Sequence, residues 1–404
     1  MIPPLTSQLA VLQQSEYEWD KFMEWKAAHK NDKAVVEPKA WTIKLKFLKL
    51  WSVLFPLRAG VLLIAIPQAL FQNIVILLAS IKLRVLQKRG LRVIAIAGSY
   101  AKTSTKNILA HILKPQYAVR VTPGNINTLF GIAREILSLS SRDQIFIAEL
   151  GEYNPGDLAK FVRLLSPQYK ILTNIGVAHL ERFKTKTALE AEFHSFAAES
   201  TANYQMSNVH VSRSGTEADV DIDGEEVHVF VPLLGKHNIE NAASCMKLAT
   251  KFGITLAQSA TALQSLPYVQ YRMEPMLLEN NVLVINNGYN SNPDSAQRAL
   301  EVLHEIDGTQ KVIITPGFVE LGSISQEANT EFGKQIAKVA DIVVLMRGAN
   351  QDDIRLGLNQ THFKNTNVYE ADTESEAMEK IKEKIKPGAV ILFENSLMEI
   401  YKIN

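Results

Sequence analysis

The segment from Gly98 to Ser104, GSYAKTS, places a lysine and hydroxyl side chains directly after an apolar run that predicts a strand. A strand, a tight loop and a helix N-terminus direct backbone N–H groups and a positive dipole end toward a phosphate. In such a loop, Lys102 would reach the outer phosphates and Thr103 would reach a Mg²⁺ ion. The arrangement suits ATP, with Gly98, Ser99 and Ser104 completing the loop around it.

This loop departs from the strict phosphate-binding pattern GxxxxGK[ST], because Ile96 and Ala101 occupy the two glycine positions. Without those glycines, the segment is also compatible with an ordinary strand-to-helix connection that carries an exposed lysine. Residues elsewhere in the chain must therefore decide between the two interpretations.

Two candidate metal ligands follow at the ends of later strands. Glu149 closes the apolar run QIFIAEL, and His179 lies just past KILTNI. Ligands of open α/β sheets collect at the carboxyl ends of strands, so these side chains could converge on one nucleotide and its metal. Carboxylates suit Mg²⁺, whereas histidine is a less usual ligand for it. Taken singly, a glutamate at a strand end is more often a surface residue, and a histidine there more often caps or packs.

The elements that must position these residues form an α/β pattern from Leu91 onward. Short β-branched runs alternate with helical stretches, which predicts a mainly parallel sheet. The predicted strands are residues 92–98, 117–122, 144–150 and 170–175, and the predicted helices are residues 102–113, 127–138, 155–165 and 186–199.

A hairpin is predicted around Asp223-Gly224, because this pair accepts the positive φ angles of a tight turn. A helix over 237–252 follows, and a second series of strands and helices begins after Pro267. Its predicted strands are NVLVIN, KVIITP, DIVVLM and AVILFE. We therefore expect three regions: a helical, membrane-associated part at 1–90, a central ATP-binding domain at 91–268, and a C-terminal domain at 269–404.

Residues 59–81 contain no charged side chain and are long enough, at 23 residues, to cross a bilayer core of roughly 30 Å. Pro67 is expected to interrupt this helix, and basic residues flank both of its ends. A single span would export one basic cluster, so a re-entrant hairpin or an interfacial helix pair is favoured. The segment predicts membrane association, with the protein at the cytoplasmic face. The alternative is a buried helical hairpin between soluble domains.

The overall charge indicates no nucleic-acid partner, because 43 Lys and Arg nearly balance 42 Asp and Glu among 404 residues. The single cysteine, Cys245, cannot form an internal disulfide and is interpreted as a buried apolar residue. Residues 1–40 lack the apolar run of a cleavable signal peptide.

Six motifs occur in a specific order: GSYAKTSTKN, TPGNIN, AELG, TNIGVAHLERF, LLGKHNIENA and YNSNPDS. In this order they resemble the Mur ligases, and the last resembles the MurF-like, D-alanyl-D-alanine-adding branch. The resemblance begins near Leu91 and covers about three quarters of the chain. It implies a central ATPase domain and a Rossmann-like C-terminal domain. It also implies activation of a carboxylate as an acyl phosphate, attack by an amine, and release of ADP and phosphate.

The resemblance also implies roles for individual residues. Lys102 would hold the β- and γ-phosphates, while Thr103, Glu149 and His179 would bind metal, His179 also counting as catalytic. The other implied positions are Asn238 and Asn241 near the base, Arg272 at the phosphates, Asn125 and Asn127 beside the carboxylate substrate, and Tyr289, Asn290 and Asn292 from the closing domain. Taken alone, HNIENA is also compatible with a polar helix start and YNSNP with a capped helix.

The chain departs from the family at four places. Ala101 replaces a loop glycine, and Asn286-Asn287 replace two aspartates. Phe193 stands where a carbamylated lysine is expected, so either Glu192 or His194 substitutes as a ligand or the second metal is absent. The usual N-terminal UDP-sugar domain is expected to be missing, with the hydrophobic segment in its place. A lipid-linked or membrane-proximal carboxylate is then plausible.

Two functions are therefore compatible with the sequence. One is an ATP- and Mg²⁺-dependent ligase that joins a small-molecule cell-wall precursor to an amino acid or dipeptide. The other is a catalytically weakened, Mur-like scaffold that binds nucleotide or precursor at the membrane. Retention of Lys102, Thr103, Glu149 and His179 favours the ligase, because phosphoryl transfer depends most on these positions.

Overall fold

The computed structural model describes residues 57–124, 126–152, 154–175, 186–196, 204–269, 271–288, 292–319, 321, 324–348 and 350–395, with side chains from residue 67 onward except those of 186 and 188. The chain divides into two compact units, Met1–Leu77 with Met398–Asn404, and Leu78–Leu397. The first unit contributes only part of one helix to the described residues. Residues 1–56, the N-terminal part of the helical region expected at 1–90, lie outside the described residues.

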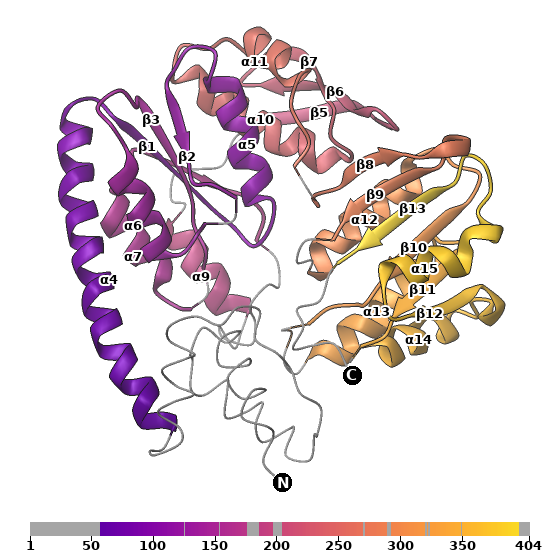
Figure 1. Ribbon diagram of the computed structural model, residues 1–404. Coiled ribbons are helices and arrows are strands. Elements are labelled where there is room, and N and C mark those ends of the chain that lie inside the picture. Colours follow the sequence, from indigo (N-terminus) through magenta and orange to yellow (C-terminus); the bar gives the residue numbers. More distant parts are fainter. Residues whose placement is uncertain are drawn as a thin grey trace. The chain divides into compact units, whose positions relative to one another are not determined.

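The first α/β module is built on a four-stranded parallel sheet in the order β2-β3-β1-β4. Its strands are β1 (Arg92–Ala97), β2 (Val119–Val121), β3 (Ile145–Glu149) and β4 (Tyr169–Leu172), and its helices are α5 (Lys102–Leu113), α6 (Leu129–Ser138), α7 (Asp157–Leu165) and α9 (Lys186–Phe196). Strand β3 is buried along its whole length, as expected for a parallel strand covered on both faces. Helix α5 covers one face of the sheet, and α6 and α7 cover the other (Figure 1). The predicted strands and helices of this region are confirmed.

A three-stranded antiparallel sheet, β5-β6-β7, follows in the chain. The predicted hairpin joins β6 to β7, and both turn residues have positive φ, 56° at Asp223 and 88° at Gly224. Strand β5 and helix α11, whose bounds follow, were not predicted. The elements are β5 (Tyr204–Ser212), β6 (Gly215–Ile222), β7 (Glu225–Val231), α10 (Lys236–Thr250) and α11 (Leu256–Leu263).

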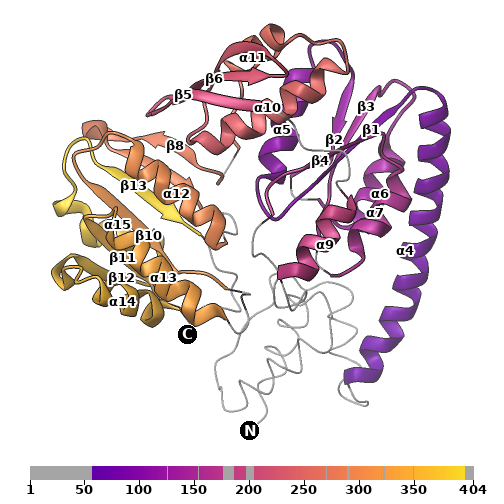
Figure 2. The ribbon, with the colours of Figure 1, turned by 180° about the vertical axis from the view of Figure 1, so that it is seen from behind.

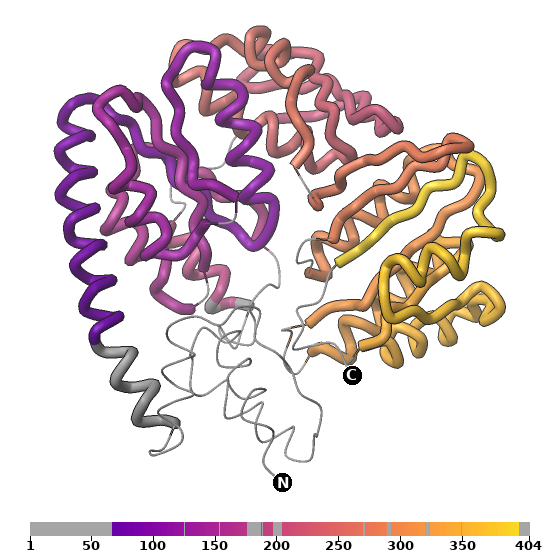
Figure 3. Tube along the Cα trace, in the orientation of Figure 1, coloured from indigo at the N-terminus to yellow at the C-terminus, as the bar shows by residue number. Residues whose placement is uncertain are grey.

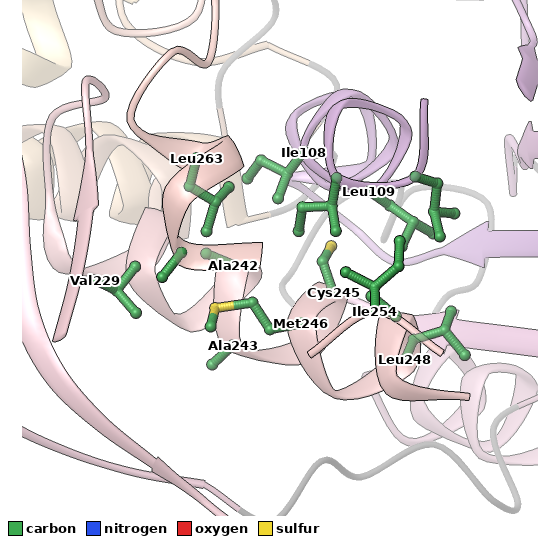
Figure 4. Packing of buried hydrophobic residues seen from close by; sticks show 14 of the residues in the cluster. Ile108, Leu109, Val229, Ala242, Ala243, Cys245, Met246, Leu248, Ile254 and Leu263 are labelled. Carbon is green, nitrogen blue, oxygen red and sulfur yellow. The ribbon is translucent and has the colours of Figure 1, made fainter. Parts of the chain in front are cut away.

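One hydrophobic core joins this antiparallel sheet to the parallel one. Apolar side chains of α5, including Ile108 and Leu109, meet those of α10 and α11, including Met246 and Leu263 (Figure 4). Cys245 lies fully buried among them, and its thiol donates a hydrogen bond to the carbonyl of Thr105, 3.5 Å away. The prediction that this cysteine is a core residue is confirmed.

The second α/β module contains six strands in the order β12-β11-β10-β13-β9-β8, with only β8 antiparallel. Figure 2 views its sheet and helices from behind. The elements are β8 (Glu274–Leu277), η1 (Glu279–Asn281), β9 (Leu283–Asn287), α12 (Pro293–Glu305), β10 (Lys311–Thr315), α13 (Ser325–Ala337), β11 (Ile342–Met346), α14 (Gln351–Gln360), η3 (Asn365–Asn367), β12 (Val368–Ala371), α15 (Glu374–Ile381), η4 (Lys382–Lys384) and β13 (Val390–Glu394). The four predicted strands are confirmed, while the edge strands β8 and β12 were not predicted. The boundary expected near residue 268 falls between α11 and β8.

The apolar N-terminal segment lies in one continuous helix, α4 (Leu57–Lys88), and the prediction that Pro67 interrupts it is wrong (Figure 1). Figure 3 traces the Cα path of the C-terminal part of this helix. A proline costs one backbone hydrogen bond and a local clash, which a helix of 32 residues accommodates here. The helical hairpins considered from the sequence are therefore wrong for residues 57–88. In the second unit, α4 packs through Ala79, Leu83 and Leu86, and Lys82 Nζ donates to the carbonyl of Leu137 in α6 at 2.6 Å.

Candidate nucleotide-binding site

The loop between β1 and α5 has the backbone shape that a phosphate-binding loop requires. Gly98 has a φ of 142°, and a Cβ atom there would lie 2.0 Å from Thr173 Oγ1. Ala101 has a φ of 64°, in the left-handed region that favours glycine. No side chain caps α5 at Ala101, so its first-turn amides have no side-chain acceptor there. The loop therefore keeps its shape although glycine is absent from residue 101.

The segment after β4 holds this loop in place. The Thr173 hydroxyl donates a 2.6 Å hydrogen bond to the carbonyl of Tyr100, and the backbone N–H of Ser99 donates to the carbonyl of Asn174 at 2.9 Å. Two motifs far apart in the sequence, GSYAKTSTKN and TNIGVAHLERF, thus meet at the ends of adjacent strands, as predicted for ligand sites of open α/β sheets.

Lys102 begins α5, and its ammonium group donates to the carbonyl of Gly98 and to Glu152 Oε1, the latter at 2.8 Å. Glu152 is only 1% exposed. Desolvation raises the pKa of its carboxyl, and the charge of Lys102 opposes that rise. The lysine expected at the outer phosphates is thus paired with a buried carboxylate.

Glu149 lies at the end of β3, and its carboxylate contacts two residues of α5. The Thr103 hydroxyl donates to both oxygens, at 3.1 and 3.0 Å, and Lys106 Nζ lies 2.8 Å from Oε2. Lys106 is 1% exposed and also donates to the carbonyl of Gly124 at 2.7 Å. The structure thereby brings together two predicted metal ligands, Thr103 and Glu149. It adds a buried lysine that the sequence did not point to.

The TPGNIN motif borders the same carboxylates. The carbonyl of Asn127 accepts the backbone N–H of Gly151 at 2.9 Å, which ties the motif to the residues after β3. Asn125, the other predicted substrate residue, lies outside the described residues. The assignment of Asn125 and Asn127 to the carboxylate substrate remains a prediction.

His179, Tyr289 and Asn290 also lie outside the described residues. Asn292 is described, and its side chain caps α12 by accepting the backbone N–H of Ser295 at 2.9 Å. The capping interpretation of YNSNP is thus confirmed at Asn292, while its contact with nucleotide remains a prediction. Within the described ranges, no group of three His, Cys, Asp or Glu side chains is placed to hold a metal ion.

The HNIENA motif begins α10, and its asparagines are buried. Asn238 Nδ2 donates to the carbonyl of Leu234 at 2.8 Å, and Asn241 Nδ2 has no hydrogen-bond partner among the described residues. Burial, reinforced by the charge of Arg298, lowers the pKa of His237 to about 3. The imidazole is therefore neutral at physiological pH, and the roles of Asn238 and Asn241 at a base remain predictions.

Arg272 lies in the linker between α11 and β8, between two residues in the left-handed region, Tyr271 at 60° and Met273 at 51°. Its contact with the phosphates remains a prediction. Asn287, at a predicted family departure, is buried between this linker and β13. Its Nδ2 donates to Glu394 Oε2 at 2.8 Å, and its Oδ1 accepts the backbone N–H of Met273 at 3.3 Å.

In helix α9, Phe193 stands at the position where a carbamylated lysine is expected. Phe193 is fully buried. The carboxylate of Glu192 accepts the backbone N–H groups of Gly156 and Leu158, both at 3.0 Å, and so caps the start of α7. His194 is exposed. The Glu192 carboxylate therefore serves helix α7, and the suggestion that Glu192 or His194 substitutes as a metal ligand remains a prediction.

Three site residues were missed by the sequence analysis. Lys106 lies one helical turn after Lys102, and Glu152 lies three residues after Glu149. This spacing from the predicted residues Lys102 and Glu149 is the only signal for them in the sequence. Arg298 of α12 donates to the Tyr100 hydroxyl at 3.2 Å and pairs with Glu240 at 3.0 Å. No motif marked it.

Comparisons with known proteins support the same assignment. Residues 96–196 and 186–249 match the Mur ligase middle domain, and residues 271–396 match the Mur ligase, glutamate ligase domain. The UDP-N-acetylmuramoyl-tripeptide–D-alanyl-D-alanine ligase of Bacillus subtilis is 26% identical to this chain, and the match covers 77% of this chain and 74% of the relative. The ligase of the same name from Escherichia coli is 28% identical, and the match covers 70% of this chain and 72% of the relative.

Solved structures have the same fold. The MurF ligase of Thermotoga maritima in complex with ADP superposes with a TM-score of 0.71 at 23% identity, covering 80% of each chain. MurF of Acinetobacter baumannii gives 0.71 at 22% identity, covering 80% of this chain and 77% of that one. With both domain types matched in order along the chain, this protein belongs to the Mur ligase family of ligases.

Proposed function

We propose that this protein is an ATP-dependent amide-bond ligase that acts on a cell-wall precursor. The observation that carries the proposal is the loop from Gly98 to Thr103, whose Thr103 hydroxyl donates to the buried Glu149 and whose Lys102 ammonium donates to the buried Glu152. Relatives named as UDP-N-acetylmuramoyl-tripeptide–D-alanyl-D-alanine ligases suggest a muramoyl-peptide carboxylate and a dipeptide amine as substrates.

The reaction balances without an oxidant or reductant. A carboxylate oxygen of the precursor attacks the γ-phosphorus of ATP, which forms an acyl phosphate and releases ADP. The amine nitrogen then attacks the acyl carbon, phosphate leaves, and the amine gives up a proton as the amide forms. Lys102 would stabilise the charge on the transferring phosphoryl group.

The residues present fit a divalent cation at this site. Glu149 supplies two carboxylate oxygens beside the Thr103 hydroxyl, and oxygen donors of this kind suit Mg²⁺. We propose that Thr103 and Glu149 hold the ion, together with His179. A bound Mg²⁺ would neutralise charge on the phosphates.

The test is ADP release by the purified full-length protein with Mg-ATP. UDP-N-acetylmuramoyl-tripeptide and D-alanyl-D-alanine form the first substrate pair, and other precursor carboxylates and amines follow. Acceptor-dependent ADP release that Lys102→Ala abolishes would support the proposal. Folded protein that binds Mg-ATP without turnover on any pair would contradict it.

The second candidate function is a catalytically weakened scaffold that binds nucleotide or precursor. The fully buried Phe193 favours it, because phenylalanine cannot bind a metal, and the Glu192 carboxylate is already engaged by the start of α7. Mg-ATP binding without turnover is its expected result in the same assay.

We also propose that α4 attaches the protein to the cytoplasmic face of an anionic membrane. Seven large apolar side chains are exposed along one stripe of the helix: Leu70, Phe71, Ile74, Leu77, Leu78, Ile81 and Val85. Arg84, Lys88 and Arg89 are exposed near its C-terminal end, and basic residues beside an apolar face favour anionic lipid. The 22-residue apolar stretch Pro67–Lys88 also has the length and hydropathy of a membrane span.

Co-sedimentation with phosphatidylglycerol vesicles tests this attachment. Phe71→Glu with Leu78→Glu should lower the bound fraction at least about tenfold, because both charges enter the apolar stripe. Leu356→Glu, at an exposed leucine of α14, serves as the matched control. Equal binding of all three proteins would contradict the membrane proposal.

A further inference from the structure

Glu152 is a buried carboxylate that the proposed reaction leaves without a role. Its Oε1 accepts a 2.8 Å hydrogen bond from Lys102, and its Oε2 is buried without a hydrogen-bond partner on any other described residue. A carboxylate removed from water is costly unless a cation or several donors compensate it. The Lys102 ammonium is the compensating charge in this structure.

The charges of the site form two pairs. The Glu149 carboxylate accepts hydrogen bonds from Thr103 and Lys106, whereas Lys102 is the one side chain among the described residues that donates to Glu152. Lys102 is also the group expected to bind the outer phosphates. A triphosphate that draws this ammonium away would leave Glu152 buried, charged and without its partner.

We infer that Glu152 is a specificity-determining residue that makes the site select metal-bound over metal-free nucleoside triphosphate. A metal-free triphosphate competes for Lys102 and adds negative charge next to two buried carboxylates. A divalent cation that arrives with the triphosphate supplies the positive charge that Glu152 loses, and carboxylates are its preferred ligands. This inference rests on the proposed nucleotide-binding function.

The experiment measures dissociation constants for ATP by calorimetry, with excess Mg²⁺ and with EDTA, on the full-length protein. The informative quantity is the ratio of the metal-free constant to the Mg-ATP constant. Glu152→Gln keeps the shape and an acceptor for Lys102 but removes the charge, so the ratio should fall at least about tenfold, which corresponds to about 1.4 kcal/mol. Glu152→Asp keeps the charge and should preserve most of the ratio.

The ratio of the two dissociation constants distinguishes selection of the metal-bound nucleotide from simple competition between Glu152 and the phosphates for Lys102. If Glu152 only competes with phosphates, Glu152→Gln will tighten both complexes by the same factor, and an unchanged ratio overturns the inference. Glu226→Gln removes the same charge from an exposed position of β7 and should leave the ratio at the wild-type value. Wild-type protein that binds no Mg-ATP would overturn the proposed function itself, which is a distinguishable result.

Discussion

Ala101 is a residue at which the chain accepts local strain to keep the phosphate loop. Its φ of 64° costs an alanine about 1 kcal/mol relative to glycine. Ala101→Gly should therefore raise the free energy of unfolding by about 1 kcal/mol and leave ATP affinity equal or stronger, as measured by urea denaturation and calorimetry. Ala110→Gly, the same change inside α5, should lower stability instead. Weaker ATP binding by Ala101→Gly would show that the alanine side chain itself serves the loop.

Lys106 is a fully buried cation that pairs with Glu149. Lys106→Met removes the charge that compensates Glu149 and should lower the free energy of unfolding by about 3–5 kcal/mol. Lys160→Met breaks an exposed pair with Asp157 of the same 2.8 Å length and should cost about 1 kcal/mol or less. Equal losses in urea denaturation would contradict the burial argument.

Asn287 gives a physical reason for one departure from the family. The side-chain amide donates to the buried Glu394, so an aspartate here would place two carboxylates in contact. Asn287→Asp should lower the unfolding free energy by about 2–4 kcal/mol at pH 7. The loss should shrink in Asn287→Asp combined with Glu394→Gln, which restores a donor. An unchanged loss in that double variant would mean that the two side chains are not coupled.

At the scale of elements, helix α4 has two faces with different tasks. Leu83 is fully buried against the central module, whereas Leu78 is 51% exposed on the apolar stripe. Leu83→Ala should therefore cost about 2–5 kcal/mol in thermal or urea unfolding, and Leu78→Ala about 0.5 kcal/mol or less. Similar effects of the two substitutions would contradict the described packing. The buried face also means that a chain beginning near Leu91 would expose the surface that α4 covers.

Elements with strong periodicity could be predicted from the sequence, and weakly marked ones could not. The buried parallel strands are continuous apolar runs, so β1, β3 and β10 were evident. Strand β5 is polar, contains Asn208 at a φ of 53° and changes register after Ser207, which hides its alternation. Strand β8 has four residues and a proline, as edge strands often do. Short edge strands depend on a neighbouring strand that the local sequence does not reveal.

For the whole molecule, the order of motifs predicted the family, the loop chemistry predicted Lys102 and Thr103, and the end of an apolar strand predicted Glu149. The predicted residues follow strands directly, so local sequence is enough to place them at one sheet edge. Lys106 and Glu152 could not be predicted, because their importance comes from burial, which only the assembled module creates. The two carboxylates and two ammonium groups form two separate ion pairs, Lys102–Glu152 and Lys106–Glu149, and their positions are a property of the fold.

The rate at which a reagent labels the buried thiol of Cys245 reports how often the core around it opens. Burial raises the pKa of this thiol, and a thiol reagent needs an exposed thiolate, so labelling has to wait until α5 and α10 separate. Since Cys245 contacts the helix that begins with Lys102, Mg-ATP at about 100 times its dissociation constant should slow labelling about 100-fold. Mass spectrometry of timed samples would measure the rate, with urea-unfolded protein as the fast limit. A labelling rate indifferent to Mg-ATP would mean that this core opens without releasing the nucleotide.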